Sequence, residues 1–131
     1  MSFIDVKVGD VEEQGPAPEG TYDLVISNAM VGEAKSSGNP QIVVTINIEG
    51  HSEYMPIRHY LGLPAEDDDQ DMSDRKRRSL KRFMTLFNIP FDDGINTEDF
   101  LGATASALVV QGEPNDNGDI YNNLIVPRIR E

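Results

Sequence analysis

The chain has 131 residues, which is the usual size of one domain around a single hydrophobic core. It contains no cysteine, which excludes a disulfide framework, a thiolate zinc site and a cysteine nucleophile. Its net charge of −12 opposes a polyanionic partner through long-range repulsion.

Residues 1–19 are polar and rich in Glu, Gly and Pro, so we expect a loosely ordered N-terminal arm before one domain over residues 20–131. The N-terminus lacks a secretory leader pattern, and 18 consecutive apolar residues occur nowhere. We therefore expect a cytoplasmic location, in a host cell if the chain is phage-encoded, and no membrane partner.

Two alternating stretches predict a β-hairpin. From Gly20 to Val31 every second residue is apolar, which places Tyr22 in the core beside Leu24 and Ile26. Residues 35–40 have turn chemistry. Alternation resumes from Gln41 to Glu49 and predicts four buried β-branched residues: Ile42, Val44, Ile46 and Ile48.

A third strand is predicted from Glu53 to Leu63, with Pro56 at a bulge or an edge because proline cannot donate to a ladder. Residues 64–71 form an acidic loop, and Ser73 is the expected N-cap of a helix that stops at 88–90. Apolar residues with i, i+3, i+4 and i+7 spacing give this helix one buried stripe: Leu80, Phe83, Met84 and Phe87.

The remaining chain predicts a helical turn capped by Thr97 and a fourth strand over residues 103–111. Asn117-Gly118 suits a type I′ hairpin turn before a fifth strand over residues 120–129. The order of three strands, a helix and two strands is that of the OB-fold. We therefore expect a mainly β, five-stranded antiparallel OB-fold barrel with one helix between strands 3 and 4.

Basic charge is concentrated in the helix. Six of the eleven Lys and Arg residues lie between Asp74 and Arg82, so that stretch carries +5 and the rest of the chain −17. Screening acts over roughly 8 Å at physiological salt, so local cations can still attract phosphates to an acidic protein. Arg77, Arg78 and Lys81 are candidate phosphate contacts, or simply the solvated face of the helix, neutralised by the acidic loop before it.

Binding of single strands needs cations along the backbone and flat rings on which bases stack. Alternation places Arg58 and Tyr60 on one face of the third strand, with the core as the alternative location for Tyr60. Tyr54 and Tyr121 are further stacking candidates. The loop between the first two strands is one wall of the OB-fold groove, or else a plain solvated hairpin loop, and supplies Lys35, Ser36, Ser37 and Asn39.

Several short motifs resemble those of small bacteriophage proteins grouped with phage single-stranded-DNA-binding OB-folds. They are Gly20-x-Tyr22, Lys35-Ser-Ser-Gly-Asn39, Arg58-x-Tyr60-Leu61, the Leu/Phe helix and a last strand containing Asn123. The resemblance covers residues 19–129. It implies a sequence-nonspecific coat for DNA exposed in phage replication and recombination, with replication or recombination proteins as further partners. The family's frequent acidic tail is replaced here by Arg128-Ile-Arg-Glu131.

We expect that the chain is not an enzyme and that it binds neither a cofactor nor a metal ion. The histidines His51 and His59 have no recognisable catalytic partners, and residues 66–71 match no closed cation site. Residues 115–118 resemble an EF-hand turn, but Leu124 stands at the position of the bidentate glutamate.

The expected function is sequence-nonspecific binding of single-stranded DNA, with homo-oligomers possible through an exposed edge strand. The alternatives are an acidic protein-interaction module without nucleic-acid binding and, third, a metal-dependent nuclease.

Overall fold

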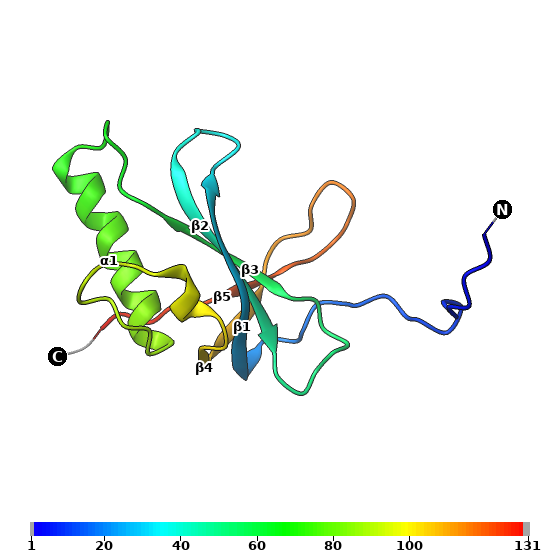
Figure 1. The fold of residues 1–131 in the computed structure, drawn as a ribbon. Helices are drawn as coiled ribbons and strands as arrows, with labels where there is room; N and C mark the ends of the chain where they lie inside the picture. The colour runs from blue at the N-terminus through cyan, green and yellow to red at the C-terminus, as the bar shows by residue number, and fades with distance from the viewer. Residues whose placement is uncertain (1, 130–131) are drawn as a thin grey trace.

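Alternating apolar residues form five antiparallel strands in the computed structural model, which describes residues 2–129 (Figure 1). The sheet order is β3-β2-β1-β4-β5, so β3 and β5 are its two edges. These edges approach each other and leave a nearly closed, OB-like barrel, which confirms the predicted fold class. The strands are β1 (Gly20–Glu33), β2 (Pro40–Ile48), β3 (Ile57–Gly62), β4 (Thr104–Gln111) and β5 (Asn122–Leu124).

The first two strands follow the predicted alternation. All four β2 residues expected in the core are buried, as are Leu24 and Ile26 of β1, and Tyr22 is half-buried against this core. A bulge between Ile26 and Asn28 interrupts the β1–β2 register. Bulges bend a strand and increase its twist, and β1 pairs with β4 before this point and with β2 on both sides of it. The bulge thus helps β1 to curl the sheet into a barrel.

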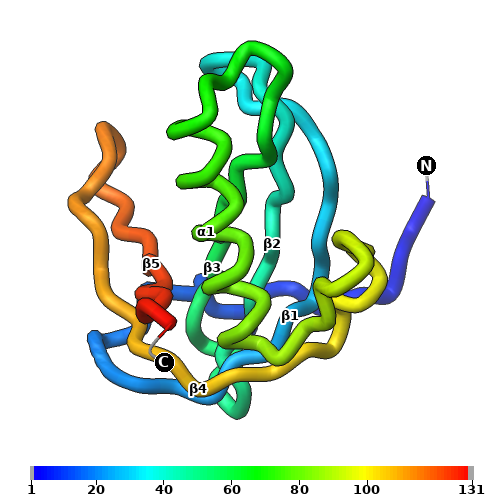
Figure 2. The backbone as a smooth tube through the Cα atoms, turned by 90° about the vertical axis from the view of Figure 1, so that its left-hand side faces the viewer, coloured from blue at the N-terminus to red at the C-terminus, as the bar shows by residue number. Residues whose placement is uncertain are grey.

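The helix α1 (Gln70–Leu86) lies between β3 and β4 in the chain and packs beside β3 (Figure 2). Its predicted stripe is confirmed, because Leu80, Phe83, Met84 and Phe87 are all buried. The Phe83 ring stacks on that of His59 with a centroid distance of 5.1 Å. No helix within residues 2–129 has the length and apolarity needed to cross a membrane.

Two predicted caps are wrong by a few residues. The N-cap of α1 is Asp69, whose carboxylate accepts from the Met72 N–H at 2.8 Å, and not Ser73. An aspartate also interacts favourably with the positive end of the helix dipole. The 3-10 helix Thr97–Phe100 is likewise capped by the side chain of Asn96, one residue before the expected Thr97. The predicted stop of α1 is confirmed, since Asn88 adopts a left-handed φ of 56°.

The third and fifth strands are shorter than predicted. β3 begins only after Pro56, because residues 53–55 turn away to pair with the N-terminal segment. β5 covers residues 122–124, and Ile125 makes one further ladder hydrogen bond to Leu108 before Pro127, which has no N–H to donate. Asn88 is the single non-glycine residue with positive φ within residues 2–129, so Asn117-Gly118 does not form the type I′ turn.

Part of the stretch predicted as a loose arm is built into the barrel. Gly15 forms an isolated parallel bridge with Tyr54, and Ala17 is fully buried. The Asn122 side chain accepts from the Ala17 N–H at 2.8 Å and donates to the Ala17 carbonyl at 2.9 Å. Gln111 donates to the same carbonyl. Residues 14–17 are therefore fixed to the barrel, and residues 2–13 extend away from it (Figure 1).

A shielded ion pair connects the acidic loop to α1. The Asp68 carboxylate accepts from Lys76 Nζ at 2.8 Å and from the Ala65 N–H at 2.8 Å, with only 9% of its side chain exposed. These donors favour the charged form and hold the pKa of Asp68 below its ordinary value.

Because the folded state lowers this pKa, the pair stabilises the protein above the unfolded aspartate pKa of about 3.9 and ceases to do so as the pH falls through the folded value. We expect Asp68→Asn to lower the free energy of unfolding at pH 7, and its difference from the parent protein to shrink below about pH 4. Urea unfolding across this pH range measures the difference. Asp67→Asn, at an exposed neighbour, is the control, and an equal effect there would contradict the expectation.

Candidate nucleic-acid interface

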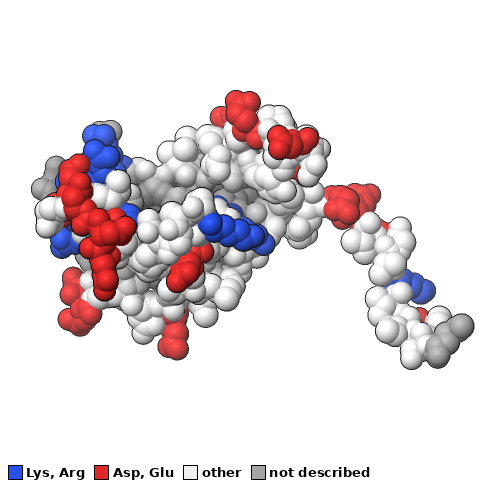
Figure 3. All heavy atoms as spheres, turned by 90° about the horizontal axis from the view of Figure 1, so that it is seen from above, with Lys and Arg blue, Asp and Glu red and all other residues white. Residues whose placement is uncertain are grey.

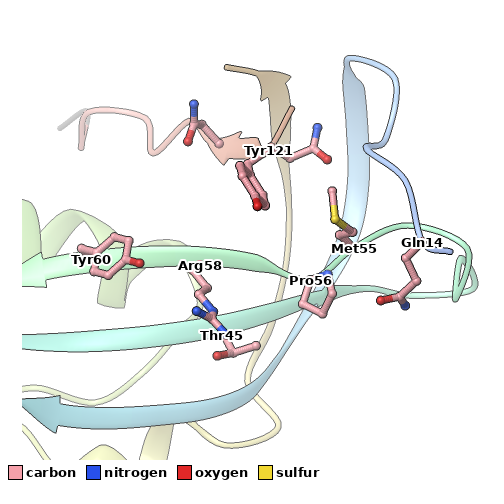
Figure 4. Close-up of a pocket in the computed structure, with 9 residues that line it drawn as sticks. Gln14, Thr45, Met55, Pro56, Arg58, Tyr60 and Tyr121 are labelled. Atoms are coloured by element: carbon pink, nitrogen blue, oxygen red, sulfur yellow. The ribbon is translucent and has the colours of Figure 1, made fainter. Parts of the chain in front are cut away.

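A cleft of about 600 Å³ lies at the seam of the barrel, where the edges β3 and β5 face each other (Figure 4). Nine residues from β2, β3, the segment around β5 and the N-terminal segment line the cleft: Gln14, Thr45, Met55, Pro56, Arg58, Tyr60, Tyr121, Asn122 and Asn123.

Arg58 and Tyr60 form one wall of the cleft. Ile57 and Leu61 of β3 are buried, and the intervening alternation turns Arg58 and Tyr60 outward, as predicted. The Tyr60 side chain is 58% exposed, so it is not the core tyrosine of the alternative interpretation. Register places Arg58 opposite Thr45, which gives the guanidinium a polar neighbour on β2.

Tyr121 faces this wall from the other side of the seam. It is 52% exposed and precedes Asn122, the buried residue whose side chain is bonded to Ala17. In Figure 4 the Tyr121 ring projects from the β5 side of the cleft toward β3, the strand that carries Arg58 and Tyr60. Two residues that are 61 positions apart in the chain thus offer two exposed rings to one cleft.

The cleft contains no carboxylate among its nine lining residues, although the chain as a whole is strongly acidic. Its polar groups are one guanidinium together with amides and hydroxyls. Figure 3 shows acidic side chains at the α1 end, along the edges of the upper face and at the base of the arm, whereas the middle of that face is mostly uncharged and carries both a basic and an acidic group. The local field in the cleft is therefore less repulsive to phosphates than the net charge suggests.

The outer face of the sheet extends the cleft away from β3. Tyr60 lies opposite Val43, and Val43 lies opposite the exposed Met30 of β1. Neighbours across strands have Cβ atoms about 4.5–5.5 Å apart, so the three side chains form a short apolar row. Such a row adds exposed apolar surface beside the cleft, over β2 and β1.

Tyr54 was also a stacking candidate, but it does not line the cleft. It is half-buried against the core, and its ring stacks on His51 at 5.1 Å in a neighbouring hollow that is also lined by Glu49. His51 Nδ1 and Glu53 Oε1 lie 2.8 Å apart, and this hydrogen bond lowers the pKa of Glu53. The carboxylates around Tyr54 make it less suited to a phosphate-bearing ligand than Tyr60 or Tyr121.

The loop between β1 and β2 supplies four candidates that the structure places outside the cleft. Lys35, Ser36 and Ser37 are exposed at the tip of the hairpin, and Gly38 provides the left-handed φ of 73° that the turn needs. The Ser37 hydroxyl accepts from the Asn39 N–H at 3.2 Å, so these two residues stabilise the turn itself.

The basic helix face lines a separate groove of about 550 Å³ between α1 and the segment after it. Its charged lining residues are Asp74, Arg77, Arg78 and Lys81, and its apolar lining residues are Leu80, Met84, Phe91 and Ile95. The predicted pairing with the acidic loop occurs at two helix cations, because Arg75 lies 3.3 Å from Asp71 and Lys76 lies 2.8 Å from Asp68. Arg77 instead lies 3.5 Å from Asp74 of the helix itself. None of the three candidate cations lines the cleft at the seam.

Six residues that line the cleft were not among the predicted site residues: Gln14, Thr45, Met55, Pro56, Asn122 and Asn123. Outward alternation on β2 is a signal that could have identified Thr45. Gln14 and Asn122 carry no such signal, because their places depend on how the N-terminal segment docks beside β5.

The histidines do not form a catalytic cluster. His59 points toward α1, and burial lowers its pKa, so it is neutral at neutral pH and stacked on Phe83. Within residues 2–129 no three His, Cys, Asp or Glu side chains are placed to hold one metal ion. In the turn at residues 115–119, the Asn115 carboxamide accepts from two backbone N–H groups, those of Asn117 and Asp119.

Comparison with known proteins gives a family but no described activity. Residues 4–126 match the model of a family described as "Protein of unknown function (DUF669)", which covers most of the chain. A search of curated proteins gave no match.

Proposed function

We propose that this chain, which belongs to the DUF669 family, binds single-stranded DNA without sequence specificity through the cleft at the barrel seam. The observation that carries the proposal is the content of the cleft: two exposed tyrosines and one arginine, with no carboxylate among the lining residues. Binding itself is the whole mechanism, and no chemical step is involved.

Stacking supplies the sequence tolerance. Every base has a π-face, so the rings of Tyr60 and Tyr121 accept any base, at about 1–3 kcal/mol for each base stacked. The two rings stand on opposite sides of the seam, and a flexible single strand can place successive bases against them (Figure 4). A duplex keeps its bases stacked on one another, and so offers these rings no free face.

Hydrogen bonding fixes the backbone of the ligand. The Arg58 guanidinium presents five N–H donors, which suit phosphate oxygens. The amides of Asn123 and Gln14 and the Thr45 hydroxyl add neutral donors around the same cleft. The Lys35 loop and the Arg77, Arg78 and Lys81 face lie outside it, and we assign them at most to contacts with the ends of a longer strand.

The proposed biological role is a protective coat on DNA exposed during phage replication and recombination. A sequence-tolerant cleft fits that role, because a coat must accept whatever strand is present. The resemblance of the motifs around Tyr22, Arg58 and Tyr60 to phage single-stranded-DNA-binding proteins is the basis for naming phage DNA as the ligand.

The direct test is a fluorescence-anisotropy titration of a labelled oligothymidylate, which has no secondary structure, at low salt. We expect saturable binding at micromolar protein, competition by unlabelled single strands of mixed sequence, and little competition by duplex of equal length. Absence of binding at micromolar protein would refute the proposal. Such a result, combined with direct binding of a replication or recombination protein, would instead favour the acidic interaction module.

Salt dependence provides a separate prediction for Arg58. Each phosphate neutralised on a single strand contributes a slope of about −0.7 to the plot of log affinity against log salt concentration. We expect Arg58→Gln to make this slope shallower by about 0.7. Arg75→Gln removes the same charge from α1, where Arg75 is paired with Asp71 and lines no cleft, and should leave the slope unchanged. Equal slopes for both variants would exclude a phosphate contact by Arg58.

A further inference from the structure

The segment formed by residues 2–13, here called the arm, exposes an unusual amount of apolar surface. Phe3 is 90% and Val8 71% exposed, and Ile4, Val6 and Val11 are similarly open to solvent. Isolated exposed apolar residues are normal, but several together on one short segment are typical of a binding surface. The arm lies largely within the part of the chain that matches the family, which begins at residue 4.

The arm has no partner within the described part of its own chain. Its two backbone hydrogen bonds are local, from the Val6 N–H to the Ile4 carbonyl at 2.9 Å and from the Val11 N–H to the Val8 carbonyl at 3.3 Å. The first bonds that connect the N-terminal segment to the barrel involve Gln14 and Gly15. Beyond that anchor, the arm projects away from the barrel on the side opposite α1 (Figure 1).

The groove beside α1 has the complementary surface. It combines the apolar side chains of Leu80, Met84, Phe91 and Ile95 with a basic margin formed by Arg77, Arg78 and Lys81. Phe91 and Ile95 are partly exposed, although both are large and apolar. The groove therefore suits a segment that carries apolar side chains together with carboxylates.

The charges of the arm meet this requirement. It contains the carboxylates of Asp5, Asp10, Glu12 and Glu13 and one lysine, Lys7, distributed among its apolar residues. On the groove, Asp74 is the one lining carboxylate. Asp92, Asp93 and Asp99 line a neighbouring hollow on the other side of Phe91 and Ile95. The cations are thus on the helix side of the groove, where an acidic segment would lie along α1.

We infer that the arm of one copy docks in the α1 groove of a second copy. A second copy is the occupant because the arm leaves its own barrel on the side away from its own α1 (Figure 1). The contact joins two different surfaces, so it is heterologous, and repetition of it gives a ring or an open chain of copies. If the DNA-binding proposal also holds, such a chain makes binding cooperative along a strand.

The test uses sedimentation velocity on the full chain at low salt without nucleic acid, so its outcome is independent of DNA binding. The arm variant combines Ile4→Ser, Val6→Ser and Val8→Ser, and the groove variant combines Arg77→Glu, Arg78→Glu and Lys81→Glu. Both sets lie on exposed positions, so the fold is retained, which circular dichroism checks. We expect the parent chain to associate with increasing concentration and each variant alone to stay monomeric.

A mixture of the two variants is the decisive sample. The arm variant retains an intact groove and the groove variant retains an intact arm, so one contact can form between them and no further growth is possible. We expect a one-to-one dimer in the mixture and no larger species. Arg75→Gln, which removes a helix charge outside the groove, should associate like the parent chain. A parent chain that stays monomeric at about 100 µM, an arm variant that associates normally, or a monomeric mixture would each overturn the inference.

Discussion

Replacing Tyr60 or Tyr121 by alanine is expected to weaken single-strand binding by roughly 5- to 150-fold each, and replacing both by more than either alone. The estimate follows from about 1–3 kcal/mol per stacked base and from 1.4 kcal/mol per tenfold change in affinity. Both side chains are more than half exposed and line the same cleft, so little folding energy depends on them. The loss should therefore appear in the dissociation constant and not in the free energy of unfolding.

Conservative variants separate stacking from hydrogen bonding. Tyr60→Phe and Tyr121→Phe retain the rings and should bind within about twofold of the parent protein if stacking dominates. Leu108→Ala removes an exposed apolar side chain from β4, outside the cleft, and Tyr22→Phe removes a hydroxyl that donates to the Pro18 carbonyl. Neither control should alter affinity. Alanine variants that bind like these controls would remove both tyrosines from the interface.

A spectroscopic readout is also available, because the chain contains four tyrosines and no tryptophan. Stacking of bases on Tyr60 and Tyr121 should quench intrinsic tyrosine fluorescence as oligonucleotide is added. In the double alanine variant the remaining rings, Tyr22 and Tyr54, are half-buried against the core, so the quenching should be lost. Quenching of unchanged amplitude would place the bases elsewhere.

Asn122→Ala should have the largest effect on stability among polar substitutions near the cleft, lowering the free energy of unfolding by about 1–3 kcal/mol. The Asn122 side chain is buried and makes the 2.8 Å bond to the Ala17 N–H, which lies in a fully buried residue. Without it this N–H has no partner, at a cost of about 1–3 kcal/mol. The Ala17 carbonyl retains its bond from Gln111, which limits the total.

Urea unfolding at pH 7 measures the effect, and the neighbouring exposed Asn123 provides the control. Asn123→Ala should stay within about 0.5 kcal/mol of the parent protein, as is usual at exposed positions. Asn122→Asp retains an acceptor for the Ala17 N–H but replaces the donor to the Ala17 carbonyl by an oxygen, so it should also be destabilised. If Asn122→Ala unfolds like Asn123→Ala, the N-terminal segment contributes little to the barrel.

The sequence predicted correctly the features that depend on the periodicity of a single helix or strand. The stripe Leu80, Phe83, Met84 and Phe87 and the alternation of β2 were predicted because apolar residues at those spacings share one face. The same rule brought Arg58 and Tyr60 to the same outward face of β3. Local rules were less reliable at element ends. Both Asp69 and Ser73 can cap a helix, and the prediction chose the wrong one.

Contacts between segments far apart in the chain could not be predicted from the periodicity of single elements. Tyr121 was a candidate from its type alone, and only closure of the barrel places it opposite Tyr60. The bonds between Asn122 and Ala17 connect residues that are 105 positions apart in the chain. The separation of the α1 cations from the cleft is equally a matter of tertiary structure.

The sequence by itself therefore determined the type of fold, the buried faces and the two β3 side chains of the candidate site, because these follow from the repeat of a single helix or strand. The tertiary structure alone decided which rings share a cleft, which polar side chains surround it and where the basic groove and the apolar arm lie. Those features arise from docking of segments far apart in the chain, where the outcome depends on complementary shape and hydrogen-bond partners that no single segment encodes.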